Sequence, residues 1–166
     1  MTDFTNSQMT GSPDDTVRIL ASSNAAVSHT AGATSETTLA TYTLPAGTMG
    51  PNDTLRITTL WSFTNSADDK RMRISFGGSN FLDELATTAG EVSMQSMQLI
   101  RNNNSLTAQK AHNNAQEAVF TKTSGAITTA VVDTTADVDI DFNVVIQTVT
   151  ETVTLESYII ELLRAV

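Results

Sequence analysis

The chain has no cysteine and only two histidines among its 166 residues, which limits the chemistry it offers. The lack of thiols excludes disulfides, zinc–thiolate sites and cysteine nucleophiles. His29 and His112 are the only imidazole bases, and neither has the sequence spacing of a nucleophile elbow or a metal site. We therefore predict no catalytic residue, no metal ligand and no cofactor, and we predict that the protein is not an enzyme.

Basic residues are also scarce. Nine Lys and Arg stand against 18 Asp and Glu, so the net charge is −9. Such a chain repels phosphate backbones and anionic membranes. No stretch approaches the ~20 apolar residues of a membrane span, and the first residues lack the basic and apolar regions of a signal peptide. We expect a soluble protein made in a cytoplasm, with neither nucleic acid nor membrane as a direct partner.

Two parts of the chain differ in composition. Residues 1–16 are small and polar, with Met1, Phe4 and Met9 as their only sizeable apolar side chains. We predict that they form an N-terminal arm. Residues 17–166 have the length of one domain, which buries roughly 70% of the surface of its unfolded chain on folding.

Most of the chain from Val17 onward shows the period-two alternation of β-strands. In residues 54–64, Leu55, Ile57 and Trp61 share one face, so we expect Trp61 in the core rather than on a sugar-binding surface. We predict that this run and 71–76 form a hairpin across the polar turn 65–69. The other predicted strands are 17–22, 37–44, 92–100, 118–122, 126–132, 138–146 and 152–163, of which 92–100 would also suit a helix.

Eight or nine strands without a convincing helix predict an all-β fold. Two packed antiparallel sheets satisfy such a pattern, so we predict an antiparallel β-sandwich, either a jelly roll or another Greek-key arrangement. Strand order cannot be derived from the alternation alone.

The run 152–163 departs from simple alternation because both of its faces carry large apolar side chains. A sandwich strand has one face on the core and one in water, so a second apolar face needs a further covering layer. We predict that Tyr158, Ile160 and Leu162 form the interface of a homo-oligomer. The alternative is that the N-terminal arm folds back over them within one chain.

Asp137, Asp139 and Asp141 are spaced by two residues and therefore share one face of a strand. One interpretation is a calcium site. Calcium sites usually gather their ligands from a loop with a tight glycine turn. We therefore favour a solvated face complemented by arginines of a neighbouring strand, such as Arg71 and Arg73.

Seven stretches together cover most of the chain from about residue 20, namely 22–30 (SSNAAVSHT), 36–41 (ETTLAT), 44–52 (LPAGTMGPN), 55–66 (LRITTLWSFTNS), 73–78 (RISFGG), 133–137 (DTTAD) and 151–158 (ETVTLESY). They resemble a recurrent pattern in structural proteins of tailed bacteriophages. The resemblance implies a jelly-roll module of the kind found in head decoration (cement) proteins and in parts of tail fibres or spikes, commonly as trimers.

The resemblance implies a location on the virion. Our first hypothesis is a trimeric cement protein that binds the major capsid protein on the outside of the head, with Phe4 and Met9 of the arm as capsid contacts. The second is a receptor-binding module of a tail fibre or spike, whose Asn-rich loops at 102–105 and 112–114 would recognise the host surface. A third, a polysaccharide-cleaving enzyme, would need two paired carboxylates, and the available ones are Glu84, Glu91 and Glu117.

Overall fold

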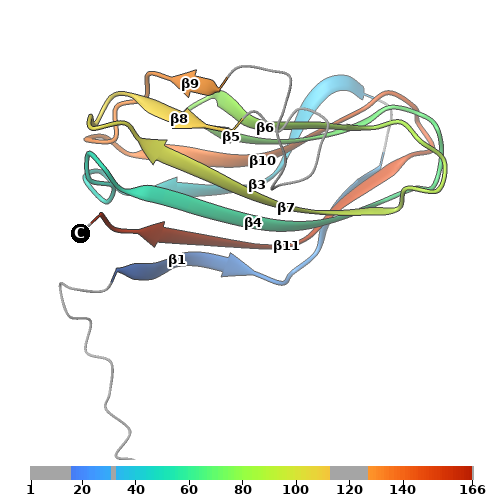
Figure 1. Ribbon diagram of the computed structural model, residues 1–166. Coiled ribbons are helices and arrows are strands. Elements are labelled where there is room, and N and C mark those ends of the chain that lie inside the picture. Colours follow the sequence, from blue (N-terminus) through green and yellow to red (C-terminus); the bar gives the residue numbers. More distant parts are fainter. Residues whose placement is uncertain (1–15, 31–32, 113–126, 166) are drawn as a thin grey trace, which may run out of the picture.

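The computed structural model describes residues 16–30, 33–112 and 127–165, which fold into two antiparallel sheets packed face to face (Figure 1). The predicted all-β sandwich is confirmed. No helix in these ranges is long and apolar enough to cross a membrane. The predicted arm lies outside the described residues except for Thr16, as do Phe4, Met9 and the predicted strand 118–122.

The strands agree closely with the alternating runs, and the ambiguous run at 92–100 is a strand. Three short or irregular strands were not predicted, namely β2, β6 and β8. The strands are β1 (Val17–Ser23), β2 (Val27–Thr30), β3 (Ala33–Leu44), β4 (Thr54–Phe63), β5 (Lys70–Phe76), β6 (Ser79–Ala86), β7 (Ser93–Asn102), β8 (Gln109–Ala111), β9 (Thr128–Ala130), β10 (Val138–Ile146) and β11 (Thr152–Leu163).

Strands from the two halves of the chain pair in a nested order. β5 pairs with β6, β4 with β7, β3 with β10 and β1 with β11, all antiparallel. Successive pairs alternate between the sheets, so the larger sheet has the order β1-β11-β4-β7-β8-β9 and the smaller one β3-β10-β5-β6, while β2 also pairs with β11. The chain thus folds as a long antiparallel ribbon wound around a common core.

The inward face of β4 lies at the centre of that core. Leu55, Ile57 and Trp61 are completely buried, as the alternation predicted. Trp61 donates its indole N–H to Thr59 Oγ1 at 2.7 Å, and Thr59 in turn shares a hydrogen bond with the Ser96 hydroxyl. A buried tryptophan needs such a partner for its one polar atom, so Trp61 is confirmed as a core residue.

The predicted hairpin between residues 54–64 and 71–76 is wrong in its pairing. β4 lies in the larger sheet and β5 in the smaller one, so the intervening turn crosses between the two layers. The hairpin partner of β5 is β6, in which the consecutive residues Phe81 and Leu82 are both buried. A β-bulge at Phe81 permits this, and it also breaks the alternation from which a strand is recognised.

A second β-bulge, at Glu156, changes which residues of β11 face the core. Leu155 lies opposite Trp61 of β4, and the next residue of β4, Leu60, lies opposite Ser157. Glu156 is therefore an extra residue in β11 with no partner in β4. Before the bulge the odd-numbered residues Val153 and Leu155 are buried; after it the even-numbered ones are. One apolar face therefore continues along the whole strand.

The prediction that Tyr158, Ile160 and Leu162 line an uncovered second face is wrong. Ile160 and Leu162 are completely buried, and Tyr158 stacks on Phe142 of the opposite sheet with ring centroids 4.6 Å apart. They belong to the core because the bulge reverses the alternation on which the prediction depended. These side chains cannot form an oligomer interface, and a homo-oligomer stays a prediction without their support.

β1 and β2 together form one edge of the larger sheet, and this edge is irregular. Both pair with β11, but residues 24–26 between them belong to no strand. Within β1 the register shifts between Ile19 and Ala21, so Leu20 is an additional bulged residue. The row of unpaired backbone groups along this edge is therefore interrupted twice.

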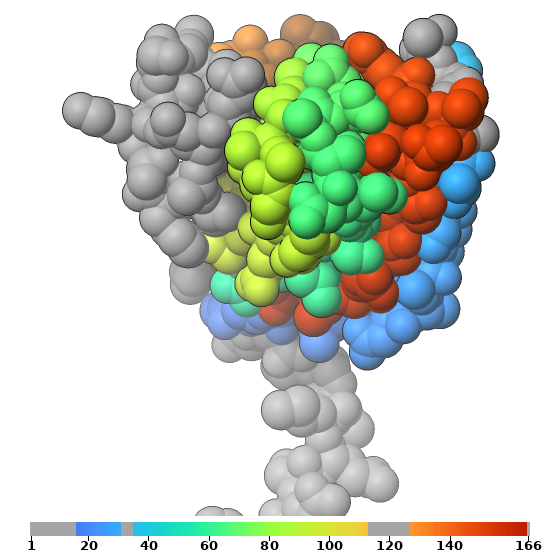
Figure 2. All heavy atoms as spheres, turned by 90° about the vertical axis from the view of Figure 1, so that its right-hand side faces the viewer, coloured from blue at the N-terminus to red at the C-terminus, as the bar shows by residue number. Residues whose placement is uncertain are grey.

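Three turns meet at the end of the sandwich that faces the viewer in Figure 2, coloured green (64–69), yellow-green (87–92) and orange-red (147–151). Backbone hydrogen bonds join them, from Phe63 to Val92 and from Gln147 to Asp69. The end is therefore a connected cap over the core.

A buried ion pair lies beneath these turns. Lys70 is completely buried and Glu151 is 3% exposed, with the Lys70 Nζ 3.4 Å from Glu151 Oε2. The ammonium group also donates to the backbone oxygens of Ser66 and Asp68 and to the Ser66 hydroxyl. Glu151 Oε2 has no hydrogen bond of its own, so this contact with Lys70 is ionic. Lys70 thus fastens the first turn to the third.

Candidate functional site

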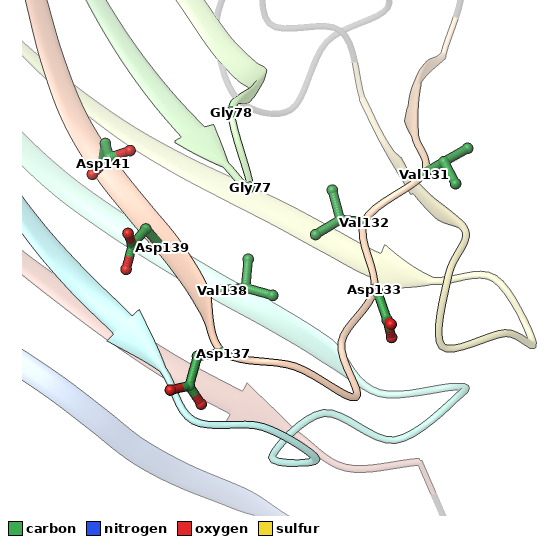
Figure 3. Close-up of a pocket in the computed structure, with 9 residues that line it drawn as sticks. All are labelled: Gly77, Gly78, Val131, Val132, Asp133, Asp137, Val138, Asp139 and Asp141. Carbon is green, nitrogen blue, oxygen red and sulfur yellow. The ribbon is translucent and has the colours of Figure 1, made fainter.

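The aspartate row predicted from the sequence borders an open hollow of about 440 Å³ (Figure 3). Its walls come from the β5–β6 turn, from the segment that follows β9 and from the start of β10. Asp139 and Asp141 lie side by side on β10, whereas Asp133 lies on the separate segment after β9. The lining residues are Gly77, Gly78, Val131, Val132, Asp133, Asp137, Val138, Asp139 and Asp141.

The two-residue turn Gly77-Gly78 sets the upper wall of the hollow. Both glycines have positive φ, +56° and +77°, as the tight turns of β-hairpins require. Gly77 also donates its N–H to the Asp139 carbonyl at 2.9 Å, and a Cβ on it would lie 2.6 Å from Val132 Cγ1. This close approach fixes the turn against the segment after β9.

The two glycines give a matched pair of substitutions. Gly77→Ala and Gly78→Ala each add left-handed backbone strain of about 1 to 2 kcal/mol. Only Gly77→Ala also forces Val132 aside, since nothing lies within 4 Å of a Cβ on Gly78, and such overpacking costs about 1 to 3 kcal/mol more. Urea denaturation of both variants should therefore show the larger loss for Gly77→Ala. Equal losses would contradict the contact with Val132.

Neutral donors, not arginines, complement the aspartate row. Thr43 and Thr41 of β3 donate their hydroxyls to Asp139 and Asp141, each at 2.7 Å. The Ala46 N–H donates to Asp137 at 2.8 Å. Hydroxyl and amide donors leave the negative charges of the row uncompensated, so this face is strongly anionic.

The prediction that Arg71 and Arg73 complement this row is wrong. Both arginines form ion pairs with Asp83 of β6, and Arg73 also pairs with Glu36 of β3. They lie on the same outer face as the row but further along β5. Within the described ranges no group of three or more acidic or histidine side chains is arranged to hold a metal ion, so the calcium interpretation gains no geometric support.

Asp133 is held by its own turn. Its carboxylate accepts hydrogen bonds from the Thr135 hydroxyl at 2.6 Å and from the Thr135 N–H at 2.9 Å. These two bonds lower the pKa of Asp133, with the hydroxyl contributing most. Thr135→Val removes only the hydroxyl, so the pKa of Asp133 should rise toward its ordinary value in an NMR titration. An unchanged pKa would contradict this geometry.

A cluster of buried amides fixes the loops around the hollow, and the sequence analysis missed it. Asn102 donates to the Gly50 carbonyl at 2.8 Å, and Gln109 donates to Asn102 Oδ1 at 2.8 Å. Gln109 also exchanges two hydrogen bonds with the backbone of Val132, and Thr134 donates to the Leu106 carbonyl. No pattern in the sequence indicated it, because Asn102 was assigned to a loop and Gln109 belongs to β8, a strand that was not predicted.

Exposed apolar side chains gather on the outer face of the larger sheet. Val17, Ile19, Leu60 and Ile159 are between 40% and 64% exposed. The register places them on the same side of three neighbouring strands, β1, β11 and β4, because each of them lies at a position that alternates with the buried positions of its strand. We name these outward positions the β1–β11–β4–β7 face; half-buried Met97, Leu99 and Leu163 extend it.

An ion pair lies within this face. Arg56 donates two hydrogen bonds to the Glu161 carboxylate, at 2.6 and 2.8 Å. These hydrogen bonds lower the pKa of Glu161 and raise that of Arg56. Both groups therefore stay charged and mutually compensated over the physiological pH range.

The other candidate residues are dispersed. His29 lies on β2 rather than in a loop, and His112 directly follows β8. Glu84 is on β6 and Glu91 precedes β7, while Glu117 lies outside the described residues. No protein-family model matches the chain, and searches of curated proteins and of solved structures found no match either.

Proposed function

We propose that the protein is a non-enzymatic head decoration (cement) protein of a tailed bacteriophage. It would bind the outer capsid surface as a homotrimer and stabilise the capsid by bridging neighbouring subunits of the major capsid protein. Such a protein acts by adding buried interface, at roughly 25 cal/mol per Å² of apolar surface before the costs of association are subtracted. Its place is the virion surface, after assembly in the host cytoplasm.

The observation that carries this proposal is the nested strand pairing. Four antiparallel pairs that alternate between two sheets support a jelly-roll topology, and a jelly-roll module is what the resemblance to phage structural proteins implies. The jelly-roll class of the sandwich is therefore part of this proposal. Fold class alone carries no function, so the phage assignment depends on the resemblance and the pairing together.

The second candidate, a receptor-binding module of a tail fibre or spike, has less support. It was based on adaptable Asn-rich loops, but Asn102 is buried and its amide holds the neighbouring loops together. Asn103 and Asn104 are exposed and keep this candidate open. The loop at 112–114 lies outside the described residues apart from His112.

A binding experiment separates the two candidates. Purified protein is mixed with undecorated phage heads and, in parallel, with host cells, and each mixture is sedimented. We expect the protein to sediment with the heads and to raise their resistance to heat. Heads that already carry their decoration protein are the control and should bind little. Sedimentation with cells alone would contradict the proposal.

The arm gives a second test of the same proposal. Phe4 and Met9 are the predicted capsid contacts, so Phe4→Ser with Met9→Ser should weaken sedimentation with heads. The thermal midpoint of the free protein should change little, since both residues precede the first strand of the sandwich. Undiminished binding would remove these two residues from the capsid contact.

A further inference from the structure

We propose that copies of this chain associate through the β1–β11–β4–β7 face. The inference deepens the proposed function by naming the surface that joins the protomers, and it rests on the homo-oligomeric part of that function. It replaces the contact predicted through Tyr158, Ile160 and Leu162, which lies in the core.

The apolar side chains of this face lie in adjoining cross-strand rows. One row runs from Ile159 of β11 through Thr58 of β4 to Met97 of β7, and the next carries Leu60. Ile19 on the edge strand, 64% exposed, extends the apolar surface past β11. An outward sheet face of a solvated sandwich normally carries polar side chains, so large apolar groups on several strands indicate a covering layer.

The charge distribution favours a second copy as that layer. The chain carries a net charge of −9, so two copies repel one another through most of their surface. The β1–β11–β4–β7 face has two positive and two negative groups and is therefore neutral. Two copies meet there with the least repulsion. The four charged residues are Arg56, Arg101, Glu156 and Glu161.

The outer face of the smaller sheet has the opposite character. It carries the aspartate row, whose partners are neutral hydroxyl groups. A basic foreign partner would be drawn to this anionic face and not to the neutral one. The charged residues on the smaller sheet's outer face are Glu36, Asp83, Asp139 and Asp141 against Arg71 and Arg73.

The ion pair on the neutral face is compatible with burial. Arg56 and Glu161 already satisfy each other with two hydrogen bonds, and Glu156 accepts a hydrogen bond from the Ser62 hydroxyl. Covering the face therefore does not leave Arg56 or Glu161 unpaired, which limits the desolvation cost.

The dimensions of the face suit a moderate contact. Four strands about 4.8 Å apart and about ten residues long cover on the order of 600 Å². A standard stable interface takes about 800 Å² from each partner. Association through this face alone should therefore depend on protein concentration, and it should strengthen when a second surface, such as a capsid, holds the protomers together.

The test measures the mass of the full-length protein by sedimentation equilibrium over a wide concentration range, without capsids. We expect the wild type to form an oligomer. Leu60→Asp with Ile159→Asp should shift it to the mass of one chain, because burying two carboxylates opposes the contact. Val149→Asp is the matched control: Val149 is 70% exposed in a turn outside the face, so the oligomer should persist. Leu60→Thr with Ile159→Thr, which keeps strand-forming residues, should weaken association at least tenfold.

A wild type that stays monomeric at every concentration overturns the inference, and so does a Leu60→Asp, Ile159→Asp variant that is folded by circular dichroism and still oligomeric. If the aspartate variant does not fold, the threonine variant decides: the inference is overturned if that variant associates as strongly as the wild type. Sedimentation with undecorated heads is read separately. If the substitutions disrupt the oligomer but the wild type does not sediment with heads, the self-contact is supported and the cement function is contradicted. If the wild type sediments with heads but the substitutions leave the mass of the oligomer unchanged, the cement function is supported and the self-contact is contradicted.

Discussion

Ile160→Asp should abolish the folded state of the domain, whereas Ile159→Asp should leave it folded. Ile160 is completely buried opposite Ile57, while Ile159 is 40% exposed opposite Thr58. A carboxylate without partners in the core costs more than about 4 kcal/mol. Since domains are stable by only about 5 to 15 kcal/mol, such a loss removes most or all of the native population.

Circular dichroism and urea denaturation of the two variants measure this difference. The adjacent isoleucines receive the same substitution in the same strand, so local strand propensity and added charge are matched. Equal stability of the variants, or unfolding of Ile159→Asp alone, would show that the bulge at Glu156 does not set the register of β11. If Ile160→Asp also abolishes an oligomer, we expect this loss to result from unfolding of the chain and not from the removal of an interface contact.

Removing one member of the buried ion pair should destabilise the domain nearly as much. Lys70→Met leaves Glu151 with an uncompensated charge beneath the turns, and breaking such a pair typically costs about 3 to 5 kcal/mol. A similar loss is expected from Glu151→Leu, which leaves the buried positive charge of Lys70 without an opposite charge. Each single variant is compared with the wild type by urea denaturation.

The double variant Lys70→Met with Glu151→Leu is the decisive comparison. Replacing both charges by apolar groups of similar size is often neutral, so the double variant should regain most of the stability that either single one loses. Losses that simply add would mean that the two charges do not compensate each other. A single variant with unchanged stability would contradict the burial of the pair.

The sequence predicted strands well wherever the alternation is regular. β4 and β10 face the core with the residues that the pattern indicated, such as Trp61 and Phe142. The bulges at Phe81 and Glu156 could not be read, because a bulge is defined by the pairing of a strand with its neighbour and not by its own residues. The turn between β4 and β5 was wrongly predicted to close a hairpin for the same reason, because the sequence does not show that the two strands pair in different sheets.

The aspartate row beside the hollow was predicted in part, but the hollow itself was not. The period-two spacing placed Asp139 and Asp141 on one face of a strand, and the structure agrees. Their partners Thr41 and Thr43 come from β3, about a hundred residues earlier in the chain. Charge favoured the arginines of β5 instead. Both β3 and β5 lie next to β10, so the register decides: Thr43 and Thr41 lie opposite Asp139 and Asp141, whereas Arg73 lies opposite Asn143.

The broken rim formed by β1 and β2 bears on the size to which an assembly can grow. A straight, continuous margin would let further chains add strand by strand, as in a fibril. Because Leu20 and residues 24–26 interrupt that margin, strand addition at this edge of the larger sheet is hindered. The proposed contact through the β1–β11–β4–β7 face is instead used up once a neighbour occupies it, so an assembly built through that contact should be small and finite.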